Sequence, residues 1–275
     1  MRIDSHQHFW RLQRNDYGWL TPELTALYKD FEPDDLAPLL HAHHIDGTVL
    51  VQAAPTDAET DFLLQLSDQH ENIKGVIGWV DFDREDASSR ITELAKHPKL
   101  VGLRPMIQDI DDVNWMLSPS VATALTSLSQ HQLVFDALIK PQHLNNLKTL
   151  VDRHPDLKIV INHGAKPNIK NDELSQWRTD INAFRNTHNI SCKLSGLVTE
   201  AKNNWQTEDL SPYLDTLFDV FGDNRILWGS DWPVCLLASS YGKWLDTIDL
   251  YLSQSHRSKE KVFGANAIRV YNLSQ

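Results

Sequence analysis

Short apolar segments recur along the chain, separated by longer segments of mixed polarity. Eight of these segments are rich in β-branched residues: 2–3 leading into His6, 47–52, 74–80, 100–104, 132–137, 157–162, 190–194 and 225–228. They are apolar almost without alternation, which is typical of parallel strands that are buried on both faces. The pattern therefore predicts eight parallel strands.

The segments between these strands have the periodicity of amphipathic helices. Ala58–His70, for example, places Phe62, Leu63 and Leu66 at helical spacing, with Thr56 available as an N-cap. Seven further helices are predicted over 33–44, 85–97, 119–131, 141–153, 176–186, 211–221 and 240–253. Each interval between strands is long enough for one crossover helix.

Eight alternating strand–helix units predict an α/β fold. A single (β/α)₈ TIM barrel, with its active site at the C-terminal face, accounts for residues 1–275 as one domain. The length is close to the ~250 residues that are typical of such barrels. The alternative is a doubly wound open sheet, which usually carries a Gly-rich loop after its first strand, whereas this chain has His-Gln-His-Phe-Trp there.

Composition narrows the class of partner. There are 26 Lys and Arg residues against 37 Asp and Glu, a net charge of −11, which is a poor match for nucleic acid or an anionic membrane surface. The two cysteines, Cys192 and Cys235, follow no metal or redox pattern and fit a reducing compartment. The chain starts with polar residues and has no run of ~18 apolar residues. We therefore predict a cytoplasmic protein without nucleic-acid or membrane partners; the sequence makes no prediction of oligomeric state.

Four polar residues stand at the ends of three predicted strands. His6 and His8 are two positions apart, so they share one face of the first strand, roughly 7 Å apart at Cα. His163 follows the sixth strand and Asp231 follows the eighth. The carboxyl ends of barrel strands meet at one rim, where barrel enzymes carry their active sites. Each residue alone is common as a hydrogen-bonded rim residue, but the four together favour a catalytic site.

Asp231 is the candidate general base. It lies between Gly229 and the dipeptide Trp232-Pro233, in a rigid and partly apolar turn. Such surroundings desolvate a carboxylate, which would tune Asp231 as a general base. The alternative is an Asp that only caps the following turn.

These residues and several longer motifs resemble a known superfamily. His6-x-His8, His163 and Asp231 resemble the metal and catalytic positions of the amidohydrolase superfamily. The motifs DSHQHFW, DYGWL, GTVLVQAAPT, GVIGWVDF, LVGLRPMIQD, KLSGLVTEA and ILWGSDWPV resemble its amidohydrolase-2 branch, and within it the L-fuconolactonase and L-rhamnonolactonase group. The resemblance extends from Asp4 to about Tyr271. It implies an enzyme that hydrolyses a sugar-acid lactone, its small-molecule partner, to the open acid.

The resemblance also concerns metal binding. His6, His8, His163 and Asp231 are ligand types that Zn²⁺ accepts, so they are candidate ligands of one divalent cation. The bridging ligand of two-metal members is lacking, because the fourth strand ends at Arg104 instead. Amide or imine hydrolysis with two metals is therefore disfavoured. One Zn²⁺ and no metal remain equal expectations, since some members of this branch bind substrate directly through the histidines.

We expect Asp231 to take a proton from the attacking water. His6, His8, His163 and Arg104, or a single cation, would then stabilise the oxyanion. Arg104 can also clamp a carboxylate or ring oxygens, although a salt bridge to a rim acid such as Asp136 would explain it equally simply.

Aromatic residues are candidates for a wall against the CH faces of a sugar. Tyr17 and Trp19, in the long connection 9–30, and Trp232 suit this role, and Ser195 is expected to approach the substrate. The connection itself is predicted to be a lid or a substrate wall, or else an aromatic cluster that closes the rim. Two other functions stay open: a metal-dependent decarboxylase of an aromatic or dicarboxylic acid, and a non-catalytic sugar-acid binding barrel.

Overall fold

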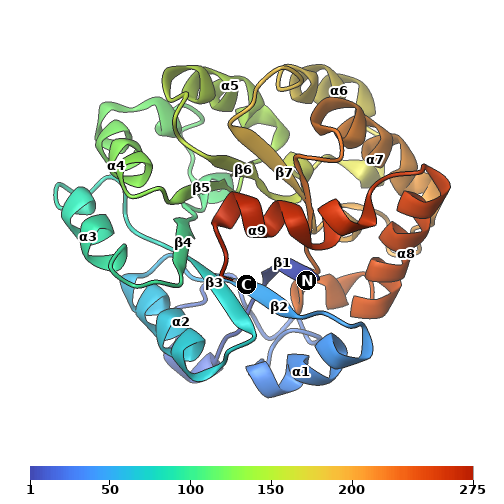
Figure 1. Ribbon diagram of the computed structural model, residues 1–275, viewed down its shortest axis with the longest axis horizontal. Coiled ribbons are helices and arrows are strands. Elements are labelled where there is room, and N and C mark those ends of the chain that lie inside the picture. Colours follow the sequence, from blue (N-terminus) through green and yellow to red (C-terminus); the bar gives the residue numbers. More distant parts are fainter. Residues whose placement is uncertain (275) are drawn as a thin grey trace.

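Eight parallel strands form one continuous sheet in the computed structural model, which describes residues 1–274. Each strand from β1 to β8 pairs with the next one along the chain (Figure 1). The strands are β1 (Ile3–Gln7), β2 (Gly47–Val51), β3 (Ile73–Gly78), β4 (Leu100–Leu103), β5 (Val134–Ala137), β6 (Ile159–Ile161), β7 (Ile190–Leu194) and β8 (Ile226–Trp228). All eight predicted strands are confirmed.

The sheet closes on itself just beyond the ends of β8 and β1. Gln7 and Trp232 form an isolated parallel bridge, and the His8 amide donates to the Trp232 carbonyl at 2.8 Å. The Asp231 amide donates to the His6 carbonyl, also at 2.8 Å. The fold is therefore a nearly closed (β/α)₈ barrel, and the doubly wound alternative is wrong.

Helices surround the barrel in the predicted order. They are α1 (Pro33–Ala42), α2 (Asp57–Gln69), α3 (Ala87–Leu94), α4 (Pro119–Gln130), α5 (Leu144–Arg153), α6 (Leu174–Asn182), α7 (Thr207–Phe221), α8 (Tyr241–Gln254) and α9 (Asn266–Tyr271). Thr56 caps α2, since its side chain accepts from the Glu59 amide, as predicted. None of the helices within residues 1–274 combines the length and the apolar character that crossing a bilayer requires.

Helix α9, which the sequence pattern did not predict, closes one end of the barrel. It crosses the end at which both termini lie (Figure 1). One apolar cluster joins strand residues to α9 and its flanks: Ile3, Val49, Val51, Ile77, Val101, Val134, Val160, Leu227, Ala267, Val270, Tyr271 and Leu273. Because this is the amino-terminal end of the strands, only the carboxyl-terminal end is left for a site.

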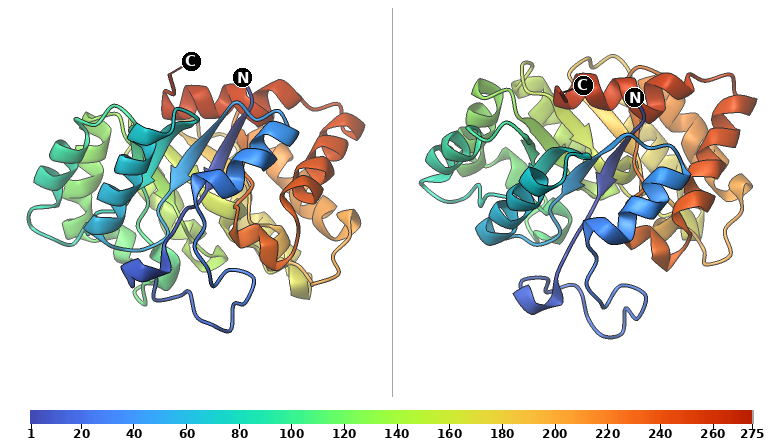
Figure 2. Two further views of the ribbon diagram at one scale, coloured as in Figure 1. Left: turned by 90° about the horizontal axis from the view of Figure 1, so that it is seen from below. Right: turned by 60° about the horizontal axis from the view of Figure 1, so that its bottom comes forward.

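The long connection between β1 and α1 lies at the opposite, carboxyl-terminal end (Figure 2). Trp10 pairs with Phe31 through an antiparallel bridge and packs edge-on against Trp19, with 5.4 Å between ring centroids. Phe31 packs in turn against Trp232 at 5.1 Å. This connection therefore contains an aromatic cluster at the rim, of the kind that the second expectation describes.

Candidate active site

A cavity of about 410 Å³ opens at the carboxyl ends of the strands. Five of the predicted site residues line it, namely His8, Trp19, Arg104, His163 and Asp231. His6 is fully buried behind them. The barrel topology thus brings together side chains that are more than 200 residues apart in the sequence.

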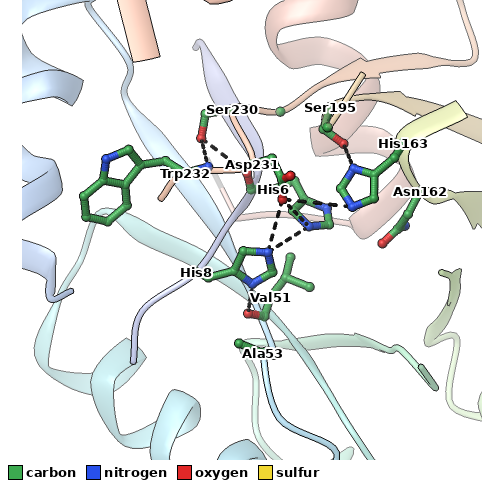
Figure 3. A network of polar contacts seen from close by, with 12 residues as sticks. His6, His8, Val51, Ala53, Asn162, His163, Ser195, Ser230, Asp231 and Trp232 are labelled. Carbon is green, nitrogen blue, oxygen red and sulfur yellow. Dashed lines mark hydrogen bonds and ion pairs between the residues drawn. The ribbon is translucent and has the colours of Figure 1, made fainter. Parts of the chain in front are cut away.

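The Asp231 carboxylate faces three imidazoles. Its Oδ1 lies 3.3 Å from His8 Nε2, 3.4 Å from His6 Nε2 and 4.0 Å from His163 Nε2 (Figure 3). The Nε2 atoms of His6 and His8 are 3.2 Å apart. Asp231 and His163 both have left-handed backbone conformations, with φ of 56° and 52°. Such strain is found mainly where the surrounding structure must hold a residue for function.

Buried contacts hold this cluster in place. Asp4 accepts from the Ser230 amide at 2.8 Å, from the His6 amide at 3.2 Å and from the Tyr241 hydroxyl at 3.1 Å. It thereby ties the end of β1 to the turn that carries Asp231. Burial raises the pKa of Asp4 to about 6. Sequence reasoning missed Asp4, although an acid at the second position of a buried strand is an anomaly.

The partners of the ring nitrogens indicate which of them are protonated. His8 Nδ1 lies 2.7 Å from the Val51 carbonyl, to which it donates. Its Nε2 lone pair therefore faces the Asp231 carboxylate at 3.3 Å. His8 Nε2 and Asp231 Oδ1 are then both acceptors, so a proton or a cation is needed between them.

A chain of buried polar groups continues behind His6. Lys193 Nζ lies 3.2 Å from His6 Nδ1 and 2.9 Å from Asp136 Oδ1. Asp136 also accepts from the Asn162 amide and, at 2.5 Å, from the Tyr271 hydroxyl of α9. The active-site cluster is thus connected to the helix that closes the far end of the barrel.

Arg104 supplies a buried cation to the cavity. Its Nη1 lies 3.3 Å from Asn162 Oδ1 and 3.4 Å from His6 Nε2, and Nη2 donates to the Gln52 carbonyl. Burial lowers the pKa of Arg104 to about 10, so the guanidinium stays charged at neutral pH. Asp136 pairs with the Lys193 ammonium instead, and within the described residues the salt bridge from Arg104 to Asp136, the alternative explanation of Arg104, is not found.

The pKa values of the histidines and of Asp231 are shifted in directions that leave the imidazoles neutral and the carboxylate charged. Burial lowers the pKa of His163 to about 3 and that of His6 well below its ordinary value; it also lowers that of His8. For Asp231, burial raises the pKa, but His163 and the hydrogen bond with His8 outweigh it. The pKa of Asp231 is therefore lowered below its ordinary value.

Ser195 lies beside His163 and does not line the cavity. Its hydroxyl is 2.9 Å from His163 Nδ1, in a fully buried position (Figure 3). The next residue, Gly196, has a φ of 61°, and a Cβ there would lie 2.5 Å from His163 Nδ1. Ser195 and Gly196 thus orient the imidazole, a contact different from the one expected for Ser195.

Only one of the three predicted wall aromatics faces the cavity. Trp19 lines it and donates from Nε1 to the Ala53 carbonyl at 2.7 Å. Tyr17 instead donates to the Glu59 carboxylate at 2.9 Å, away from the cavity. Trp232 packs edge-on between Phe9 and Phe31 in the rim cluster.

Several wall residues have no counterpart in the sequence reasoning. The polar ones are Gln108, Asp109, Lys166, Thr199 and Glu200. They lie on the short 3₁₀ turns Ile107–Asp109, Asn162–Ala165 and Val198–Glu200, or directly after them. Their position just beyond the ends of β4, β6 and β7 is a signal that could have identified them.

Three imidazoles and a carboxylate at the carboxyl-terminal rim of a (β/α)₈ barrel make up a site of the hydrolase type. The chain belongs to the amidohydrolase family, because the model of the family described as "Amidohydrolase" matches residues 3–273. It is 40% identical to L-fucono-1,5-lactonase of Burkholderia ambifaria, over 100% of this chain and 96% of that protein.

Solved structures show the same relationship. An amidohydrolase from Burkholderia multivorans with bound zinc is 34% identical, with a TM-score of 0.94 and 100% of both chains covered. A 2,6-dihydroxybenzoate decarboxylase is 15% identical, with a TM-score of 0.66 over 99% of this chain and 98% of that one. The likeness to the decarboxylase shows a shared fold alone.

Proposed function

We propose that this protein is a lactonase that hydrolyses a sugar-acid lactone, of the kind represented by L-fucono-1,5-lactone, to the open acid. The observation that carries the proposal is the identity of 40% to such an enzyme along the full length of this chain. The cavity supports it, because a buried carboxylate, neutral imidazoles and a guanidinium meet there as ester hydrolysis requires.

The lactone would be opened by water activated on Asp231. The Asp231 carboxylate accepts a proton while the water oxygen bonds to the lactone carbonyl carbon. The resulting oxyanion is stabilised by the Arg104 guanidinium, whose Nε–H has no hydrogen-bond partner within residues 1–274. When the bond between the carbonyl carbon and the ring oxygen breaks, Asp231 returns the proton to that oxygen.

The residues also fit a single divalent cation. Donor atoms of His6, His163 and Asp231 lie within 4.8 Å of one another, and the His8 lone pair faces Asp231. Imidazole and carboxylate are ligands that Zn²⁺ accepts. Such a cation, when bound, would polarise the lactone carbonyl.

A pH-indicator assay of purified protein on a panel of sugar lactones tests the proposal, because ring opening releases a proton. We expect turnover of a six-carbon deoxy-sugar 1,5-lactone. Parallel reactions with and without chelator report whether a cation takes part. Silence across the panel with Zn²⁺ present would contradict the proposal and favour assays of CO₂ release from aromatic acids.

A further inference from the structure

Lys166 and Glu200 form an ion pair on the wall of the cavity. The Lys166 ammonium lies 3.0 Å from Glu200 Oε1, and the two side chains are 25% and 23% exposed. Both residues line the cavity that contains Asp231. An ion pair at this exposure adds little to folding stability, so its position calls for another explanation. The mechanism proposed above uses neither residue.

The backbone that carries Lys166 is strained. Four consecutive residues, His163 to Lys166, have left-handed conformations with φ of 52°, 58°, 63° and 51°. Such conformations are unfavourable for residues other than glycine. The Lys166 amide closes the turn by donating to the His163 carbonyl at 2.8 Å. The turn therefore directs both His163 and Lys166 to the same cavity.

Gln108, on the turn that follows β4, adds an unpaired acceptor to the wall. Its Oε1 is buried and has no hydrogen-bond partner within residues 1–274, while its Nε2 donates to Asp109 Oδ2 at 3.3 Å. Lys140 fixes the backbone by donating to the Gln108 carbonyl at 2.7 Å. A buried acceptor without a partner is unfavourable, and a hydroxyl of a bound ligand would satisfy it.

We propose that Lys166, Glu200 and Gln108 form a hydroxyl-recognition subsite that selects polyhydroxylated lactones over unsubstituted ones. The inference rests on the proposed function and adds the part of the substrate that these residues contact. The Glu200 carboxylate and Gln108 Oε1 accept from substrate hydroxyls, and the Lys166 ammonium donates to them. A site of this kind rejects an analogue without hydroxyls, since its own polar groups are then left unpaired.

The test compares two lactones with the same six-membered ring. L-Fucono-1,5-lactone carries hydroxyls, and δ-valerolactone carries none. The measured quantity is the ratio of kcat/KM for the first to that for the second, in the wild type and in Lys166→Met, Glu200→Gln and Gln108→Leu. We expect each substitution to lower this ratio, by roughly 10- to 100-fold for the two charged residues. Lys148→Met is the control, because Lys148 pairs with Asp152 on α5, outside the cavity, and it should leave the ratio and both rates unchanged.

Two results would overturn the subsite. One is an unchanged ratio in both Lys166→Met and Glu200→Gln. The other is a loss of equal size on both lactones, which would make the pair a structural feature of the turn. Failure of the proposed function can be distinguished from failure of the subsite, because the wild type would then open neither lactone. In that case calorimetric binding of the open acid, L-fuconate, decides: weaker binding to Lys166→Met supports the subsite, and equal binding contradicts it.

Discussion

Lys193 and Asp136 form an ion pair in which both side chains are fully buried, with 2.9 Å between Nζ and Oδ1. The same ammonium lies 3.2 Å from His6 Nδ1. An ammonium can only donate, so the neutral His6 ring accepts at Nδ1 and carries its proton on Nε2. The pair thus makes His6 a hydrogen-bond donor toward Asp231 and His8.

Substitutions in the Lys193–Asp136 pair should distinguish its effect on stability from its effect on catalysis. Lys193→Met leaves the Asp136 charge buried without its partner, which we expect to cost about 3–5 kcal/mol of unfolding free energy. Adding Asp136→Asn should restore much of that stability but leave His6 free to adopt either tautomer. We therefore expect the double variant to fold yet lose kcat roughly 10- to 100-fold. Urea unfolding and lactone turnover measure the two effects, and a double variant with wild-type kcat would refute this role of Lys193.

The Lys193 ammonium should also weaken metal binding. A ligand needs the Nε2 lone pair of His6, which the contact with Lys193 converts to an N–H, and a nearby positive charge repels a cation. We expect the Lys193→Met/Asp136→Asn variant to bind Zn²⁺ about tenfold or more tightly than the wild type. Calorimetric titration with Zn²⁺ gives both constants. Equal affinities would mean that Lys193 does not oppose the cation.

Gly196 should be intolerant of a side chain. A Cβ at this position meets His163 Nδ1 at 2.5 Å, and φ is 61°. Gly196→Ala must therefore displace the imidazole and strain the backbone, which should cost about 1–3 kcal/mol of stability and lower kcat more than it raises KM. Gly222→Ala is a matched control, since Gly222 has a similar φ of 59° but nothing within 4 Å of its Cβ. If both variants lose kcat equally, crowding of His163 is not the cause.

Glu59 should make stability depend on pH. It accepts from the Tyr17 hydroxyl and the Ala53 amide, and burial raises its pKa to about 7. Between its ordinary value of 4.5 and about 7 the folded state binds a proton that the unfolded state does not. Stability from this residue is therefore lost as the pH rises through that window, by at most about 3 kcal/mol.

Glu59→Gln tests this sign, because Gln mimics the protonated acid. Relative to the wild type, the variant should gain stability between pH 5 and pH 8 in urea unfolding. A difference between the two proteins that does not change with pH would show that Glu59 is not protonated in the folded state.

The barrel was readable from the sequence because strands buried on both faces leave continuous apolar runs. The ends of the helices shifted by a few residues; the segment predicted from Gln176 to Asn186, for example, is helical over Leu174–Asn182. Helix α9 could not be predicted in this way. It has only six residues, and its place across the barrel end depends on tertiary packing.

The site was readable only where strand direction fixes a side chain. These positions are at a strand's carboxyl end or just beyond it, and the barrel brings those ends together; the residues are His6, His8, His163, Arg104 and Asp231. Beyond the strand ends, tertiary packing sets the path of the chain. The sequence pattern therefore did not predict that Lys166 lines the cavity, nor that Tyr17, Ser195 and Trp232 do not. Lys193 is a charged residue within the buried strand β7, which is an anomaly that the sequence shows. Its pairing with Asp136 could not be read from the sequence.

Turnover of L-fucono-1,5-lactone by the wild type and by Asp231→Asn tests the central claim most directly. The claim is that Asp231, ionised because its pKa is lowered, activates water for attack on a lactone. The account predicts ring opening by the wild type and a loss of kcat of roughly 10²- to 10⁴-fold in a folded Asp231→Asn protein. A folded Asp231→Asn protein that opens the lactone at the wild-type rate would contradict it.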